Sequence, residues 1–126
     1  MAAHFVELPG LKVHVDHVAY MPHLEAPQDK PHPFVYFISI HNRSDRPLTI
    51  RGRKWIVTEL TGERVVVEGD GVVGKCPHLD PGESFSYNSY HVVAGPCTAE
   101  GAYFGVCDDG LPVFTRIPSF ELVPPE

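Results

Sequence analysis

The stretch Glu68-Gly-Asp-Gly-Val-Val-Gly-Lys-Cys-Pro-His-Leu-Asp-Pro-Gly-Glu83 decides between two classes of fold. Its glycines form G-x-G-x-x-G at Gly69, Gly71 and Gly74, and G-x-x-x-x-G-K from Gly69 to Lys75. Both patterns occur in nucleotide-binding folds. They bind phosphate where the glycine loop leads into a helix, because the helix N-terminus presents free N–H groups to the anion.

The residues after the glycines argue against such a helix. Pro77 and Pro81 follow within one or two turns, and Pro81-Gly82 is typical of a turn. The Walker pattern also requires Ser or Thr after the lysine to hold Mg²⁺, and this chain has Cys76. The stretch therefore predicts a glycine-rich loop stiffened by proline, in a fold other than a Rossmann or P-loop fold.

Turn-forming residues are spread along the chain and leave no room for a long helix, with 13 prolines and 11 glycines among 126 residues. Residues 11–16 alternate between apolar and polar, which predicts a half-buried strand. Residues 34–40 are nearly all apolar, which predicts a strand buried on both faces. Further strands are predicted at 54–60, 64–67, 85–87, 103–107 and 113–117, with hairpin turns at Thr61-Gly62 and Asp108-Asp109-Gly110.

About seven or more short strands predict an all-β chain folded as an antiparallel β-sandwich of the immunoglobulin or fibronectin type III kind. We expect one domain over residues 1–126, with a core from about 11 to 122. The sole tryptophan, Trp55, is predicted to lie in that core.

The composition limits the classes of partner and the compartment. The net charge is −6 and no extended Lys/Arg cluster exists, which predicts no binding to nucleic acid or to an anionic membrane. No apolar run approaches the length of a membrane span, and the first residues do not resemble a signal peptide. Three cysteines without a C-x-x-C pair predict free thiols and a cytoplasmic location.

The histidines and cysteines do not suggest a metal site or a nucleophile. His14 and His17 are three residues apart, so on a regular strand they point to opposite faces. Cys76 and His78 could share one side, but two ligands are too few for a zinc site. Lys75 is the only nearby cation that could lower the thiol pKa. We therefore predict no catalytic residue, no metal ligand, no cofactor and no enzymatic activity.

The acidic pair Asp108-Asp109 has a structural explanation. Asp is favoured before Gly110 because its side chain bonds to the backbone of a turn, and adjacent turn residues rarely converge in a cleft. The pair is therefore expected to form a turn.

A basic cluster leaves a second reading open for the glycine loop. Arg51 and Arg53 can be solvated strand-edge charges. Alternatively, they can hold a small anion or a nucleotide phosphate together with loop amides, since successive N–H groups can form an anion-binding nest without a helix. The residues of this candidate loop site are Gly69, Gly71, Val72, Val73, Gly74 and Lys75.

The loop also allows a structural prediction. At least one of its glycines should adopt a positive φ, which β-branched residues resist. If the loop contacts a partner, Val72 or Val73 should be exposed.

A family resemblance covers most of the chain, from about Leu11 to Leu122. The motifs that carry it are, in order, Gly52-Arg53-x-Trp55-Ile56-x-Thr58, Gly62-Glu63-x-x-x-Val67-Glu68-Gly69-x-Gly71-Val72-Val73-Gly74, Pro77-x-Leu79-x-Pro81-Gly82-Glu83, Gly101-x-Tyr103, Asp108-Asp109-Gly110 and Phe114-x-x-x-Ile117-Pro118-x-Phe120-x-Leu122. These motifs closely resemble the ApaG family. One departure is Tyr87-Asn88-Ser89-Tyr90, where the family usually shows Tyr-Thr-Ser-Gly.

The resemblance implies a fibronectin-type-III-like β-sandwich in a bacterial protein. The family is associated with cobalt tolerance and magnesium handling, and related domains occur inside larger eukaryotic proteins. That distribution implies a non-enzymatic module that binds a partner protein, of unknown identity. The alternatives are anion or phosphate binding at the loop from Gly69 to Lys75 and a role in handling divalent cobalt or magnesium.

Overall fold

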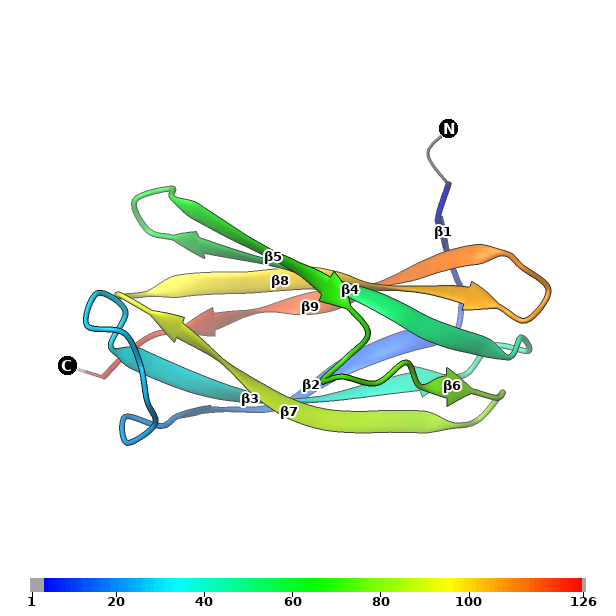
Figure 1. The fold of residues 1–126 in the computed structure, drawn as a ribbon, viewed down its shortest axis with the longest axis horizontal. Helices are drawn as coiled ribbons and strands as arrows, with labels where there is room; N and C mark the ends of the chain where they lie inside the picture. The colour runs from blue at the N-terminus through cyan, green and yellow to red at the C-terminus, as the bar shows by residue number, and fades with distance from the viewer. Residues whose placement is uncertain (1–3, 126) are drawn as a thin grey trace.

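The chain folds into two β-sheets packed face to face (Figure 1). The computed structural model describes residues 4–125, and no helix occurs within them. Accordingly, this part of the chain holds no helix long and apolar enough to cross a membrane. The strands are β1 (Val6–Glu7), β2 (Leu11–Tyr20), β3 (His32–Asn42), β4 (Leu48–Glu59), β5 (Arg64–Asp70), β6 (His78–Leu79), β7 (Ser84–Val93), β8 (Cys97–Cys107) and β9 (Pro112–Leu122).

The two sheets differ in width. The larger has the order β1-β9-β8-β4-β5, with β6 also paired to β4, and the smaller has the order β2-β3-β7. The predicted all-β sandwich is confirmed, and the narrower likeness to fibronectin type III domains stays a prediction. One pairing differs from the antiparallel prediction, because β1 runs parallel to β9. β1 has only two residues, which are too few to show the alternating pattern by which a strand is predicted from sequence.

Both predicted hairpins are present. β4 pairs with β5, and β8 pairs with β9 around a turn in which Gly110 has a φ of 94° and donates its N–H to the Cys107 carbonyl, 2.8 Å away. The Asp109 carboxylate accepts the Leu111 amide, which is the turn role expected of it.

The core lies between the sheets and is built from alternate residues of each long strand. Trp55 is 1% exposed, which confirms its predicted place. Its ring lies 4.9 Å from that of Tyr36 and 5.8 Å from that of Phe120, measured between centroids. The first contact joins β3 of the smaller sheet to β4 of the larger, and the second joins β4 to β9 within the larger sheet.

Two predictions about individual strands are wrong. β3 is not buried on both faces, because Val35 and Phe37 on its outer face are half-exposed. Within residues 4–125 no third layer covers the smaller sheet. His14 and His17 do not point to opposite faces. A bulge between Val15 and His17 shifts the register, so they pair with Ser39 and Phe37, which are two apart on β3 and share a face.

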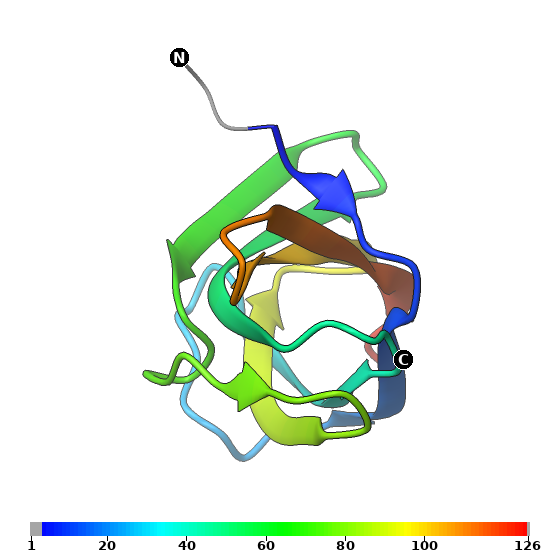
Figure 2. The same cartoon turned by 90° about the vertical axis from the view of Figure 1, so that its right-hand side faces the viewer.

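The sandwich has one closed flank and one open flank. On the closed flank, β2 packs beside β9, and the buried Thr115 hydroxyl donates to the Leu11 carbonyl across the two sheets at 2.8 Å. On the open flank, β5 and β7 are the free edges of their sheets. Figure 2 shows β9 close to β2 on one side and β5 standing apart from β7 on the other.

Candidate functional site

The glycine stretch is partly strand and partly turn. β5 continues to Asp70, so Gly69 is not a loop residue, which corrects the predicted loop boundary. Gly69 pairs with Arg53 on β4. A Cβ at Gly69 would lie 2.7 Å from Arg53 Nη1, so glycine makes room here for the guanidinium.

The rest of the stretch is a tight turn. Val72 and Lys75 exchange two backbone hydrogen bonds of 2.7 and 3.0 Å, and Val73 and Gly74 between them have φ values of 46° and 78°. Two positive φ values in succession are typical of a type I′ turn. The positive φ at Gly71 and Gly74 confirms the prediction for the glycines. Val72 is buried in the core and Val73 is exposed, as the interaction hypothesis requires of at least one valine.

Hydrogen bonds inside the molecule already use several donors of the predicted anion site. Arg53 Nη1 donates to the carbonyls of Asp70 and Gly71 at 2.9 and 3.1 Å, so its guanidinium holds the end of β5 to β4. The Gly71 amide donates to the Arg51 carbonyl at 2.7 Å. The Val72 and Lys75 amides close the turn. The Gly71, Val72 and Lys75 amides are thus bound within the molecule, and the Asp70 and Gly71 carbonyls face Arg53.

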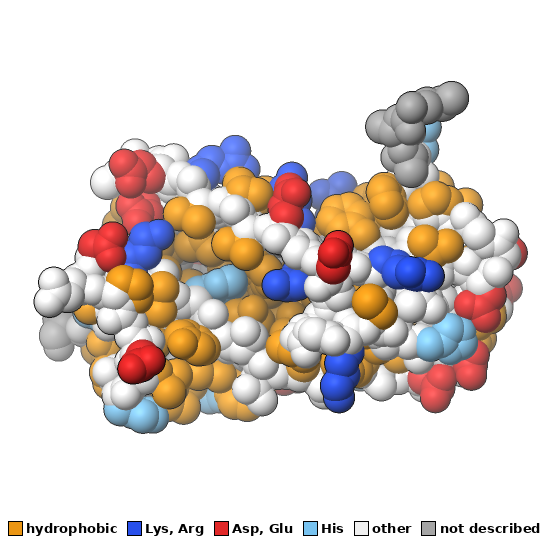
Figure 3. Space-filling view, viewed as in Figure 1, with side chains coloured by type: hydrophobic (Ala, Val, Ile, Leu, Met, Phe, Trp, Pro, Cys, Tyr) orange, Lys and Arg blue, Asp and Glu red, His pale blue; other side chains and the backbone are white. Residues whose placement is uncertain are grey.

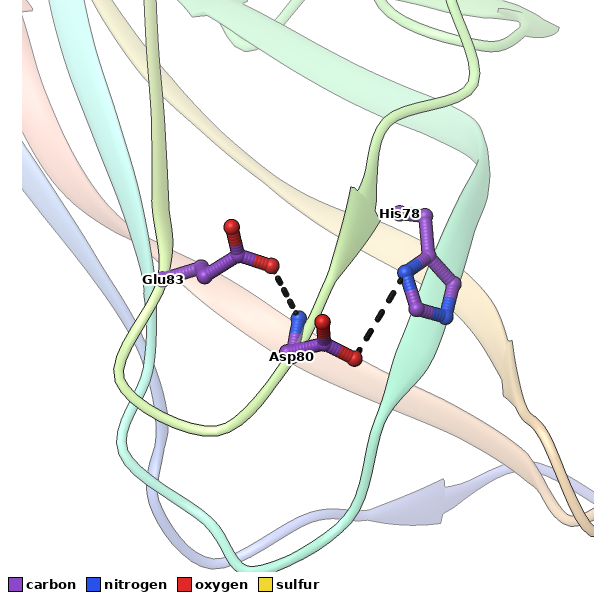
Figure 4. Close-up of side chains that lie close together, drawn as sticks. All are labelled: His78, Asp80 and Glu83. Atoms are coloured by element: carbon purple, nitrogen blue, oxygen red, sulfur yellow. Dashed lines mark hydrogen bonds and ion pairs between the residues drawn. The ribbon is translucent and has the colours of Figure 1, made fainter.

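A small polar cluster lies after the turn, where His78, Asp80 and Glu83 bring one ligand atom each within 4.8 Å of one another (Figure 4). All three are exposed. Each also has a partner in the molecule: His78 Nε2 lies 3.1 Å from Asp108, and Glu83 accepts the Asp80 amide at 2.8 Å. Cys76 is exposed but does not join the group. Hydrogen bonding and a surface turn account for the cluster.

The open flank contains an apolar groove that the sequence did not predict. Val65 and Val67 pair with Val57 and Trp55, whose side chains face the core, so both belong to the inner face of β5. They are nevertheless 37% and 40% exposed, because the smaller sheet ends at β7 and does not reach β5.

The groove has a volume of about 330 Å³. Figure 3 looks onto this flank and shows hydrophobic side chains gathered around a hollow between β5 and β7. Besides Val65 and Val67, its lining comprises Lys30, Val57, Glu59, Tyr90, His91, Val92, Val93 and Cys97.

His91 forms the inner wall of the groove and is neutral there. Burial lowers its pKa to about 4, and its Nε2 atom has no hydrogen-bond partner within residues 4–125. Its ring packs against Trp55 at 4.8 Å, and Trp55 Nε1 likewise lacks a partner in that range. An uncharged wall suits an apolar ligand, because a charge placed beside it would be poorly solvated.

The tyrosines behind the groove are packing residues. Burial raises the pKa of Tyr36, Tyr87 and Tyr103, and the Tyr87 and Tyr103 hydroxyls bond to each other across the sandwich. Raised pKa values keep these phenols neutral, which suits structural hydrogen bonding.

Sequence reasoning missed Val65, Val67 and His91 as surface-forming residues. The run Val65-Val66-Val67 beside a turn was the available clue, since it lacks the alternation of a half-buried strand. Tyr90 lines the same groove and is 46% exposed.

The chain belongs to the ApaG family: the family described as "ApaG domain" matches residues 22–106. Protein ApaG from Methylococcus capsulatus is 38% identical over 116 residues, which cover 91% of each chain. Protein ApaG from Anaeromyxobacter dehalogenans is 43% identical over 93 residues, covering 73% of this chain and 74% of the relative.

Solved structures agree with the fold. The crystal structure described as the putative ApaA protein from Bordetella pertussis is 33% identical, with a TM-score of 0.82 over 96% of this chain and 98% of that one. The solution structure of a putative late embryogenesis abundant protein is 14% identical, with a TM-score of 0.51 over 92% of this chain and 73% of that one. The second likeness concerns the fold alone.

Proposed function

We propose that the chain is a non-enzymatic protein-interaction module whose binding site is the groove between β5 and β7. The observation that carries the proposal is the exposure of Val65 and Val67 on the inner face of β5, where a wider opposite sheet would have buried them. Exposed apolar surface gathered at a hollow is the usual form of an interaction site.

The groove specifies the chemistry of its occupant. Its floor and walls are mainly aliphatic and its histidine is neutral, while Lys30 and Glu59 supply one charge of each sign. An extended segment of a partner protein fits this lining if it places an uncharged aliphatic or aromatic side chain in the hollow. Of the groups with strongly altered pKa values, Tyr87 and Tyr103 pack in the interior and bond to each other, while His91 forms the wall of the groove.

The proposal includes a cytoplasmic location. Cys97 and Cys107 are buried thiols and Cys76 is an exposed one, and a reducing compartment keeps such thiols unpaired.

Site-specific photo-crosslinking in the native host tests the binding site. A photoreactive residue at Val67 is expected to give a discrete adduct with another protein, and Val65→Asp in the same chain is expected to abolish it. A photoreactive residue at Phe5, which is exposed on another face, serves as the control. Adducts at Val73 of the turn but not at Val67 would move the site to the glycine loop. Adducts at neither position would overturn the interaction proposal for this flank.

A further inference from the structure

The outer edge of β5 is a second surface, distinct from the groove on its inner face. β5 pairs with β4 on one side only, so its other side ends the larger sheet (Figure 1). Two other edges are interrupted, because β1 pairs with Val113 and Phe114 of β9 and β2 carries the bulge near Asp16. β7 is a second regular free edge, in the smaller sheet. A regular seven-residue edge without proline or bulge is open to pairing with another strand.

The hydrogen-bond pattern shows which backbone groups point outward. The Glu59 amide bonds to the Glu63 carbonyl at 2.8 Å, and the Gly71 amide bonds to the Arg51 carbonyl at 2.7 Å. In an antiparallel ladder bonded pairs occur at every second residue. Residues 65, 67 and 69 therefore bond to β4, whereas Arg64, Val66 and Glu68 direct their N–H and C=O groups away from it.

We propose that a second copy of this chain pairs along this edge, antiparallel, with the two-fold axis at Val66. This register places Val66 opposite the partner's Val66, so a side chain that is 52% exposed meets its own copy. It also places Arg64 opposite the partner's Glu68, and Glu68 opposite the partner's Arg64. Each outward-pointing residue then lies opposite an outward-pointing residue of the partner, and each charge lies opposite one of the other sign. An isologous contact requires this.

The charges of the single chain are consistent with this arrangement. Arg64 makes no ion pair within residues 4–125, whereas Glu68 lies 3.6 Å from Lys54 on the outer face. In the dimer the Glu68 carboxylate would lie between Lys54 and the partner's Arg64. Opposite charges placed directly across two strands stabilise the pairing.

A neighbouring register fits less well. Moving the axis to residue 67 would place Arg64 opposite the partner's Asp70, but it would also place Val66 opposite the partner's Glu68. It would further require the Asp70 carbonyl, which already accepts Arg53 Nη1 at 2.9 Å. The register centred on Val66 uses only backbone N–H and C=O groups that point away from β4.

The paired edge would leave the groove open. Val65 lies on the inner face opposite the partner's Val67. The Val65 and Val67 side chains of the two copies would therefore form one continuous apolar surface, with β7 of one copy on one side and β7 of the other copy on the other. The dimer is therefore compatible with the proposed groove and does not depend on it, because it uses the backbone edge and the outer-face side chains of β5.

Sedimentation equilibrium over a concentration series tests the pairing. The mass of the wild-type protein is expected to rise from 14.0 kDa toward twice that value. Arg64→Glu and Glu68→Arg should each raise the dimer Kd by about tenfold, because each replaces two attractive pairs by two repulsive ones. An equimolar mixture of the two variants should associate again, since every cross-strand pair in the mixed dimer is of opposite sign.

Lys12→Glu is the matched control, because it changes the net charge as Arg64→Glu does but lies exposed on β2. It should leave the Kd unchanged. Slowed amide exchange at Val66 and Glu68 in the dimer would locate the contact independently of any variant. A wild-type protein that stays monomeric up to its solubility limit would overturn the proposal. So would a dimer whose Kd is unaffected by Arg64→Glu, or variants that fail to associate when mixed.

Discussion

The two flanks of the sandwich use the same kind of residue with opposite results. On the closed flank Val113 of β9 faces the core and is fully buried, beside the Thr115 hydrogen bond that joins the sheets. On the open flank Val65 and Val67 of β5 also face inward, yet more than a third of each side chain is exposed. The difference comes from the opposite sheet, which extends to β2 on one side and stops at β7 on the other. A surface for binding can thus arise from unequal sheet widths rather than from special residues.

The largest expected effect concerns the residue behind the open flank. Trp55→Ala should lower the free energy of unfolding by about 3–5 kcal/mol, the usual cost of removing a buried large aromatic side chain. Urea denaturation measures it, with Trp55→Phe as a milder control. A loss under about 1 kcal/mol would mean that water on the open flank reaches Trp55 and that this side chain does not belong to the core.

The next effect tests whether water reaches the inner wall of the groove. The pKa of His91 is about 4 in the folded chain and near 6.5 in an unfolded one. Between these values the unfolded state binds a proton that the folded state does not, so stability falls as the pH falls. The His91-dependent loss should reach about 3 kcal/mol from pH 6.5 to pH 4.

Urea denaturation at a series of pH values, compared with His91→Phe, isolates this contribution from those of the other histidines. Parallel curves for the two proteins would show that His91 has an ordinary pKa and is hydrated. The groove would then be wetter and more polar than its lining suggests.

A smaller effect compares the flanks directly with the same substitution. Val113→Ala should cost about 2 kcal/mol, because two buried methyl groups are lost and a cavity remains. Val67→Ala should cost under about 1 kcal/mol, because much of that side chain is already in water. Equal losses in urea denaturation would remove the distinction between a closed and an open flank.

The smallest effect is expected at the glycine turn that ends β5. ATP, GTP and NAD should bind with a Kd of roughly millimolar or weaker, because no helix dipole reinforces the turn and the Gly71, Val72 and Lys75 amides already bond to backbone carbonyls. Calorimetry at physiological salt measures it. A micromolar Kd abolished by Gly71→Val would place the functional site at the turn instead of the groove.

Much of the fold could be read from the sequence because the evidence is local. The hairpin at Asp108-Asp109-Gly110, the core position of Trp55 and the positive φ of Gly71 and Gly74 follow from residue type and period alone. The bulge that places His14 and His17 on one face could not be read, since one extra residue shifts the period without a distinctive residue type.

The sequence by itself determined that this chain is an all-β sandwich of the ApaG family and that its glycine stretch lacks a nucleotide-binding helix. Only the tertiary structure decided which apolar residues are covered. Residue type makes Val65, Val67 and Val113 equally suited to an inner face, but burial depends on whether a strand of the opposite sheet lies across from them. That depends on how many strands each sheet contains, and the pairing of distant segments sets that number.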